Sequence, residues 1–84
     1  MRVVTNDERE SEVQRRLRLP YHRVICGEPQ DGYMGEVPEL PGCYTSGDTP
    51  EEALANLAEA MAAWIESSLK SGDPIPDPAR PILP

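Results

Sequence analysis

The clearest pattern of apolar and polar positions lies in the second half of the chain, over residues 50–71. Apolar side chains recur there at spacings of three and four residues, as on one face of an α-helix, at Leu54, Leu57, Met61, Ile65 and Leu69. Thr49 precedes Pro50, and Glu52 stands three residues after Thr49, which is the pattern of a capped helix start. Gly72 is well placed to end the helix. We therefore predict one long helix over residues 50–71.

Shorter patterns before this helix predict three strands. Residues 21–26 alternate in a way that suits a strand, although the alternation leaves open which face is buried. The turn-rich segment 27–32 connects this strand to a second one over residues 33–37, which ends at a proline that cannot donate to a ladder. A turn over residues 39–42 leads to a short third strand at residues 43–46.

The chain begins with a polar segment in which acidic and basic side chains alternate. Residues 5–18 predict a helix that Thr5 or Asn6 caps, with acids in its first turn and arginines at its end, where they complement the helix dipole. Its apolar face is narrow, so it is an appendage to the rest. We divide the chain into an N-terminal helical extension, residues 1–18, and one domain, residues 19–84.

Together these elements predict an α+β domain in which an antiparallel sheet packs on one long helix. The sheet has three strands, or four if residues 80–83 add a short edge strand, where proline is tolerated. Gly35, inside the second strand, marks a bulge or a close approach of another backbone. Trp64 is one position off the apolar line, so it belongs either to the core or to a contact with another subunit or partner. A core this small favours self-association, and we expect a homodimer or homotetramer.

Charge is distributed unevenly along the chain, whose formal net charge is −7. Residues 1–23 carry six arginines and four acids, whereas residues 24–84 carry eleven acids against Lys70 and Arg80. A phosphate backbone repels such an acidic domain, so we expect a basic protein partner and no direct nucleic-acid binding. The pattern of a signal peptide is missing and no apolar run is long enough to cross a membrane, which predicts a cytoplasmic protein without membrane contact.

Candidate chemistry is sparse. Four acids invite comparison with metal-dependent nucleases, in which clustered carboxylates hold magnesium: Asp31, Glu36, Glu39 and Asp48. All four lie in or beside predicted turns, so we expect no metal site, no catalytic residue and no cofactor. His22 is expected at the solvated surface, and Glu51 and Glu52 would repel a phosphate from the start of the long helix. Cys26 and Cys43 lack the spacing of metal ligands and are expected to be small buried apolar residues.

Three motifs make the chain similar to a known family. They are VPELPGC at residues 37–43, GDTPEEA at residues 47–53 and GDPIP at residues 72–76. In this order, after a Gly-Tyr pair, they resemble the HicB family of antitoxins over residues 19–78. The resemblance implies a partial ribonuclease-H-like fold, β-β-β-α with a fourth short strand, that lacks nuclease activity. It also implies a partner, a small basic HicA-type toxin that is a ribonuclease acting on messenger RNA.

The resemblance therefore predicts an antitoxin that binds such a toxin and blocks it sterically. As partner-binding residues we name Tyr33, Glu36, Glu39 and Asp48, in the second strand and the turns near it. Many family members carry a C-terminal DNA-binding domain, for which this chain has no room, so we do not expect autorepression. Two alternatives stay open: a metal-dependent nuclease or hydrolase on the same scaffold, and an assembly domain without a toxin.

Overall fold

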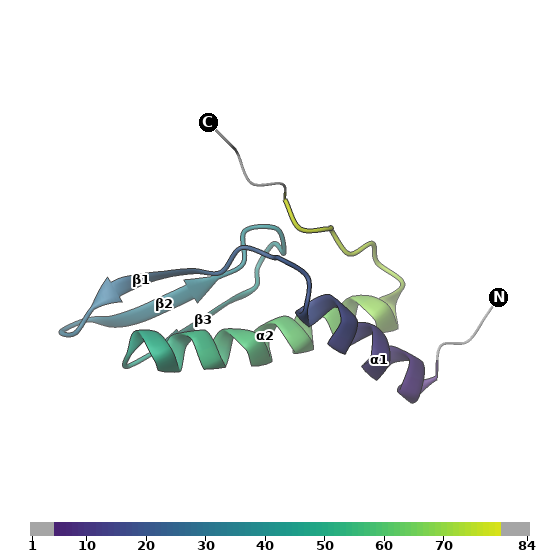
Figure 1. Ribbon diagram of the computed structural model, residues 1–84, viewed down its shortest axis with the longest axis horizontal. Coiled ribbons are helices and arrows are strands. Elements are labelled where there is room, and N and C mark those ends of the chain that lie inside the picture. Colours follow the sequence, from purple (N-terminus) through teal and green to yellow (C-terminus); the bar gives the residue numbers. More distant parts are fainter. Residues whose placement is uncertain (1–4, 80–84) are drawn as a thin grey trace.

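The computed structural model describes residues 5–79, which form two helices and one three-stranded sheet (Figure 1). In chain order the elements are α1 (Asn6–Leu17), β1 (Val24–Glu28), β2 (Gly32–Glu36), β3 (Tyr44–Gly47) and α2 (Pro50–Ser71). The predicted α+β fold, with an additional N-terminal helix, is therefore confirmed. The predicted fourth strand at residues 80–83 lies outside the described residues, and the ribonuclease-H-like relationship stays a prediction.

The sheet is an antiparallel meander in which β2 lies between β1 and β3. A tight turn joins β1 to β2, and the amide of Asp31 closes it by donating to the carbonyl of Glu28 at 3.1 Å. The register pairs Ile25 with Gly35 and Gly35 with Thr45, so these three residues form one row across the sheet. This row fixes which side chains share a face of the sheet.

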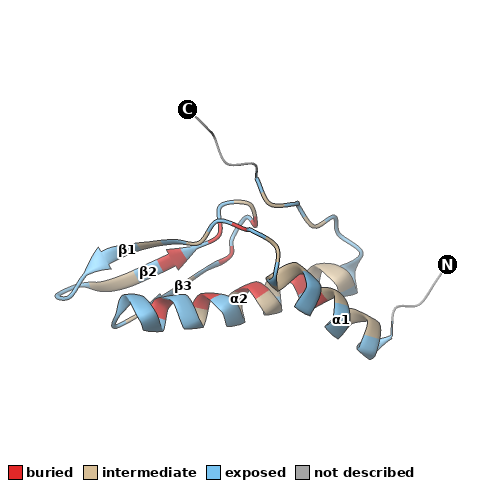
Figure 2. Cartoon of the chain, in the orientation of Figure 1, coloured by how far each residue is buried: buried red, intermediate tan, exposed pale blue. Residues whose placement is uncertain are grey.

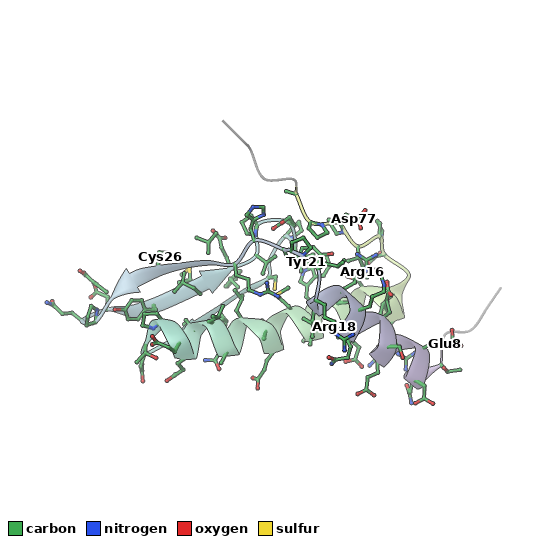
Figure 3. The ribbon with its side chains drawn as sticks, in the orientation of Figure 1. Glu8, Arg16, Arg18, Tyr21, Cys26 and Asp77 are labelled. Atoms are coloured by element: carbon green, nitrogen blue, oxygen red, sulfur yellow. The ribbon has the colours of Figure 1, made fainter. Side chains whose placement is uncertain are left out.

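The strand β1 begins at Val24, later than predicted, because Tyr21 belongs to the core and not to the sheet. The side chain of Tyr21 is 4 % exposed, and its hydroxyl donates to the carbonyl of Pro76 at 2.5 Å. The same hydroxyl accepts a hydrogen bond from the guanidinium of Arg16 at 3.1 Å. Arg16, Tyr21 and Asp77 accordingly lie close together where α1, the segment before β1 and the C-terminal segment meet (Figure 3).

The helix α2 runs along one face of the sheet and supplies much of the buried core (Figure 2). Its buried residues follow one another at intervals of four: Ala53, Leu57, Met61 and Ile65. Leu54, which the periodicity placed on the buried face, is instead 46 % exposed. The first turn of α2 lies directly against Gly47 of β3, and this close approach turns the small alanine toward the sheet. The prediction for Leu54 was therefore wrong by one position.

Both ends of α2 follow the sequence prediction. The hydroxyl oxygen of Thr49 accepts a hydrogen bond from the amide of Glu52 at 3.0 Å, which satisfies one of the free donors of the first turn. Gly72 ends the helix in the left-handed conformation, with φ of 75°. Thr5 caps α1 in the same way, through the amide of Glu8 at 3.1 Å.

Two further contacts join the peripheral elements to this core. The helix α1 packs on α2 through Val13, which is 6 % exposed, with Leu17 beside the core cluster. Trp64 is half-buried against the core, and its indole nitrogen donates to the carbonyl of Pro41 at 2.8 Å. Trp64 thus ties α2 to the turn between β2 and β3, as expected for the first of its two predicted positions, the core.

Candidate functional site

One face of the sheet packs on α2, and within the described part of the chain no element covers the other face. Gly35 marks the packed face, because a Cβ atom there would lie 3.4 Å from a methyl group of Leu57. Successive residues of a strand point to opposite faces, so the neighbours of Gly35 point away from the helix. The register extends this rule to β1 and β3. We call the outward surface the open face; it consists of Val24, Glu36 and Tyr44 in one row and Cys26, Met34 and Ser46 in the next.

The open face is unusually apolar for an exposed surface. Val24 is 42 % exposed, Met34 is 54 % exposed and Tyr44 is 65 % exposed. Cys26 is exposed as well, so the prediction that it is buried was wrong (Figure 3). It lies on an even-numbered position of β1, and those positions point away from α2. Cys43, by contrast, is buried as predicted, and burial raises the pKa of its thiol.

The predicted partner-binding residues lie at three separate places. Tyr33 points to the same side of the sheet as Gly35, and it lines a small hollow together with Asp48. Glu36 stands in the middle row of the open face, between Val24 and Tyr44. Glu39 lies in the turn after β2. The structure therefore brings Tyr33 and Asp48 together and places Glu36 and Glu39 apart from them.

The Glu39 carboxylate holds three distant parts of the chain together. It accepts hydrogen bonds from the backbone amide of His22 at 3.1 Å and from the amide of Ala79 at 2.9 Å, and it lies 2.8 Å from the imidazole Nδ1 of His22. Its side chain is only 6 % exposed. Burial on its own would raise the pKa of Glu39, but the hydrogen bonds from His22 and Ala79 stabilise the carboxylate and lower its pKa to about 2. Glu39 is thus engaged within the chain, and His22 is its partner.

The two ends of the molecule differ in charge. Residues 24–69, which include the whole sheet and nearly all of α2, contain nine acids and no lysine or arginine. Among residues 5–79, the arginine and lysine side chains lie in α1, in the segment between α1 and β1 and at the end of α2, and several of them are already paired. Arg15 and Arg16 both bind Glu12, at 2.7 and 3.0 Å, and these contacts lower the pKa of Glu12 to about 2. The guanidinium of Arg23 donates to the carbonyl of Leu17 at 3.1 Å.

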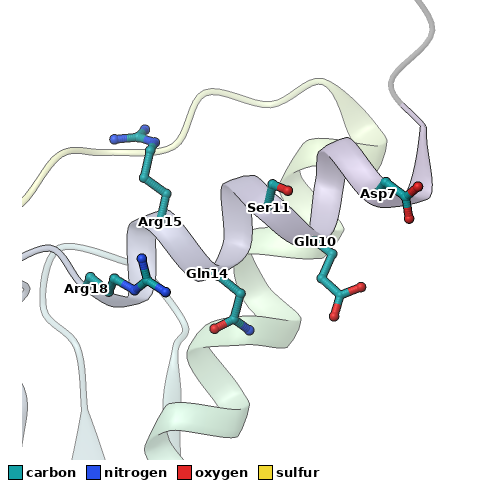
Figure 4. Close-up of a pocket in the computed structure, with 6 residues that line it drawn as sticks. All are labelled: Asp7, Glu10, Ser11, Gln14, Arg15 and Arg18. Carbon is teal, nitrogen blue, oxygen red and sulfur yellow. The ribbon is translucent and has the colours of Figure 1, made fainter.

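The helix α1 carries a shallow hollow of its own (Figure 4). Its lining consists of polar side chains of α1 and of the residue that ends it: Asp7, Glu10, Ser11, Gln14, Arg15 and Arg18. All of them come from one exposed helix surface, so no second wall encloses a ligand. This hollow therefore has the character of a solvated helix surface.

The carboxylates do not gather into a metal centre. Between residues 5 and 79 there is no group of three or more His, Cys, Asp or Glu side chains that could hold a metal ion. Asp31 and Asp48 line the same hollow near Tyr33, whereas Glu36 and Glu39 lie elsewhere. An enzyme of the metal-dependent nuclease type requires such carboxylates to converge. In the same part of the chain, neither helix is long and apolar enough to cross a membrane.

A small acidic α+β domain with an exposed apolar sheet face has the character of a protein-binding module. The sequence matches the family described as the HicB-like antitoxin of bacterial toxin–antitoxin systems, over residues 21–82. This match includes all three strands and α2. The chain belongs to the HicB-like antitoxin family.

Relatives from distant organisms share the same region. A UPF0150 protein of Thermoplasma acidophilum is 48% identical over 56 residues, which are 66% of this chain and 81% of that protein. A UPF0150 protein of Synechocystis is 43% identical over 56 residues, 67% of this chain and 71% of the relative. A 14.9 kDa protein from the rep–hol intergenic region of Haemophilus phage HP1 is 43% identical over 53 residues, 62% of this chain but 40% of the longer phage protein. No solved structure matches the chain.

Proposed function

We propose that the chain is the antitoxin of a toxin–antitoxin pair and that it acts by binding and not by catalysis. Its partner is then a small basic HicA-type ribonuclease, and the chain silences this toxin by covering the surface to which messenger RNA binds. A toxin that cleaves messenger RNA acts in the cytoplasm, so we place the antitoxin there too.

The observation that carries this proposal is the negative charge of the sheet and α2. It gains its meaning from the family match, because the chain belongs to an antitoxin family. Nine acids and no base over residues 24–69 give this part of the molecule the sign of charge that an RNA backbone has. A basic surface that attracts RNA attracts this domain by the same force. The inhibition is steric, and it requires no reaction by any residue of the chain.

The sequence-based assignments remain part of the proposal. The partner-binding residues named above are Tyr33, Glu36, Glu39 and Asp48. Glu36 has the best position of these for direct contact, because it is exposed on the open face. Glu39 would contribute indirectly, by holding the turn after β2 in place. We also keep the division into an extension, residues 1–18, and an antitoxin domain, residues 19–84, and the expected homodimer or homotetramer.

The test begins with recovery of partners of the tagged full chain from its native cells. A recovered basic protein is separated from the chain in urea, refolded and incubated with messenger RNA. We expect the recovered protein to cleave RNA when the chain is absent. Cleavage should stop when an equimolar amount of the chain is added. An unrelated acidic protein of similar charge serves as the control for non-specific inhibition. Cleavage that continues in the presence of the chain would contradict the proposal, and the absence of any partner would favour an assembly domain.

A further inference from the structure

We propose that the open face is the surface that docks the basic partner, with Glu36 receiving a cation of that partner. The inference rests on the proposed function, because it assigns a place to the same interaction. It concerns residues that the sequence did not single out, mainly Val24, Met34 and Tyr44. The partner is identified by its chemistry, as a protein that presents an apolar patch with an arginine or lysine in it.

The composition of the open face supports docking of a protein. Each of the three strands contributes one large apolar side chain to the open face, with exposed fractions between 42 and 65 %: Val24, Met34 and Tyr44. Val24 and Tyr44 flank Glu36 in one row, and Met34 lies diagonal to both of them. Diagonal neighbours on paired strands are about 7–8 Å apart, which long and aromatic side chains still span, so the three form one patch around Glu36. Protein interfaces have an apolar centre of this kind, and tyrosine is among the residues that contribute most to binding energy.

The position of Glu36 indicates the charge of the partner. Its register partners are Val24 on one side and Tyr44 on the other, so the carboxylate rises from the middle of an apolar row. When a partner covers this row, water is displaced from the carboxylate. A buried carboxylate without a counter-charge is strongly unfavourable, whereas an arginine can bind it in a bidentate, charge-assisted contact. A partner with a cation at this point is therefore favoured over one without.

The same feature disfavours a second copy of the chain as the occupant. Two open faces packed on each other would bury both Glu36 carboxylates in the same interface. Neither copy could neutralise them from its own sheet, because residues 24–69 contain no lysine or arginine. The expected homodimer would instead form through the edge of β1 or β3, since these are the two outer strands of the sheet.

Cys26 provides a direct readout, because it lies on the open face and is exposed, while Cys43 is buried. The probe is the basic protein recovered with the chain in the experiment above, carrying an inactivating substitution so that both proteins can be purified. The rate at which N-ethylmaleimide alkylates Cys26 is measured for the free full-length chain and for the chain saturated with the probe. We expect the partner to slow this alkylation at least about tenfold, because it covers the thiol.

Matched variants test the role of the charge. Glu36→Arg reverses the charge on the open face and should weaken binding of the probe at least about tenfold, and Tyr44→Ala should do likewise. Glu59→Arg makes the same charge change on an exposed position of α2 and should weaken binding less than about threefold. Thermal melts check that each variant is folded, which we expect because all three positions are exposed.

The outcomes separate the two proposals. If the probe binds but leaves Cys26 reactive and all three variants bind like the wild type, the antitoxin function stands and the docking surface is wrong. If the probe does not bind the wild-type chain, the proposed function fails and the docking surface fails with it. Sedimentation of the free chain over a range of concentrations tests the other possible occupant of the open face, a second copy of the chain. Self-association that protects Cys26 would assign the open face to a second copy and overturn the inference.

Discussion

The close contact between Gly47 and the first turn of α2 yields the sharpest prediction about stability. A Cβ atom built on Gly47 would lie 2.5 Å from the amide nitrogen of Ala53 and 2.9 Å from its Cα atom. Both are backbone atoms, and the same nitrogen donates to the carbonyl of Thr49 at 2.9 Å. Neither atom can give way without disturbing the start of the helix. Gly47→Ala should therefore push α2 away from β3 by about 1 Å and loosen the core beneath it.

The size of this effect follows from the general cost of overpacking. Overpacking of a core costs about 1–3 kcal/mol, and a clash with backbone belongs at the upper end, about 3 kcal/mol. A domain of this length has a total stability of roughly 4–13 kcal/mol, so the loss is a large part of it. Dividing this loss of about 3 kcal/mol by the entropy of unfolding of a domain of this length gives a fall of about 15–20 °C in melting temperature.

Gly42→Ala is the matched control, because it introduces the same methyl group without a clash. No atom lies within 4 Å of a Cβ at Gly42, but its φ of +83° is a conformation that alanine adopts only at a cost of about 1 kcal/mol. Thermal and urea unfolding, followed by circular dichroism, measure both variants. A Gly47→Ala protein that melts within about 5 °C of the wild type, or that is at least as stable as Gly42→Ala, would refute the reasoning.

Three further predictions concern single side chains. The pKa of Glu39 is lowered to about 2 in the folded state, so its stabilisation is complete above about pH 4.5 and is lost as the pH falls from there toward 2. Glu39→Gln should weaken the pH dependence of urea unfolding in this range, and an unchanged dependence would contradict the role of Glu39. Thr49→Ala should reduce the free energy of unfolding by about 1 kcal/mol in urea titrations, and an unshifted midpoint would mean that the cap is unimportant. In the native chain one thiol, Cys26, should react quickly with a maleimide and Cys43 only after unfolding, whereas equal rates would show that Cys43 is accessible.

The sequence was sufficient to predict α2 closely, because independent local signals agree there. The cap at Thr49, the helical period of the apolar residues and the stop at Gly72 each indicate the same boundaries, and all depend on residues near in sequence. The position of Leu54 shows the limit of such signals. Its neighbour Ala53 faces the sheet because the helix approaches Gly47 closely, and periodicity carries no information about that distance.

The open face was harder to predict, because alternation alone does not say which side of a strand meets the helix. The one local signal was Gly35, since a glycine inside a strand indicates a close neighbour and hence the covered side. Counting outward from Gly35 would have placed Val24, Met34 and Tyr44 on the exposed side. The binding partners of Glu39 had no local signal at all, because His22 and Ala79 are 17 and 40 residues away in the sequence.

The uneven distribution of net charge along this chain also has a kinetic consequence. Residues 24–69 carry nine acids and no lysine or arginine, whereas arginines slightly outnumber acids over residues 1–23, so the charge distribution has a dipole that turns the acidic sheet end toward an approaching cationic protein. Such steering raises the association rate. Its range is the Debye screening length, which is about 8 Å at physiological ionic strength and becomes shorter as salt is added. Salt should thus slow capture of a basic partner, while a complex already formed dissociates at nearly the same rate. Under the proposed function, this charge pattern favours rapid capture of a basic partner.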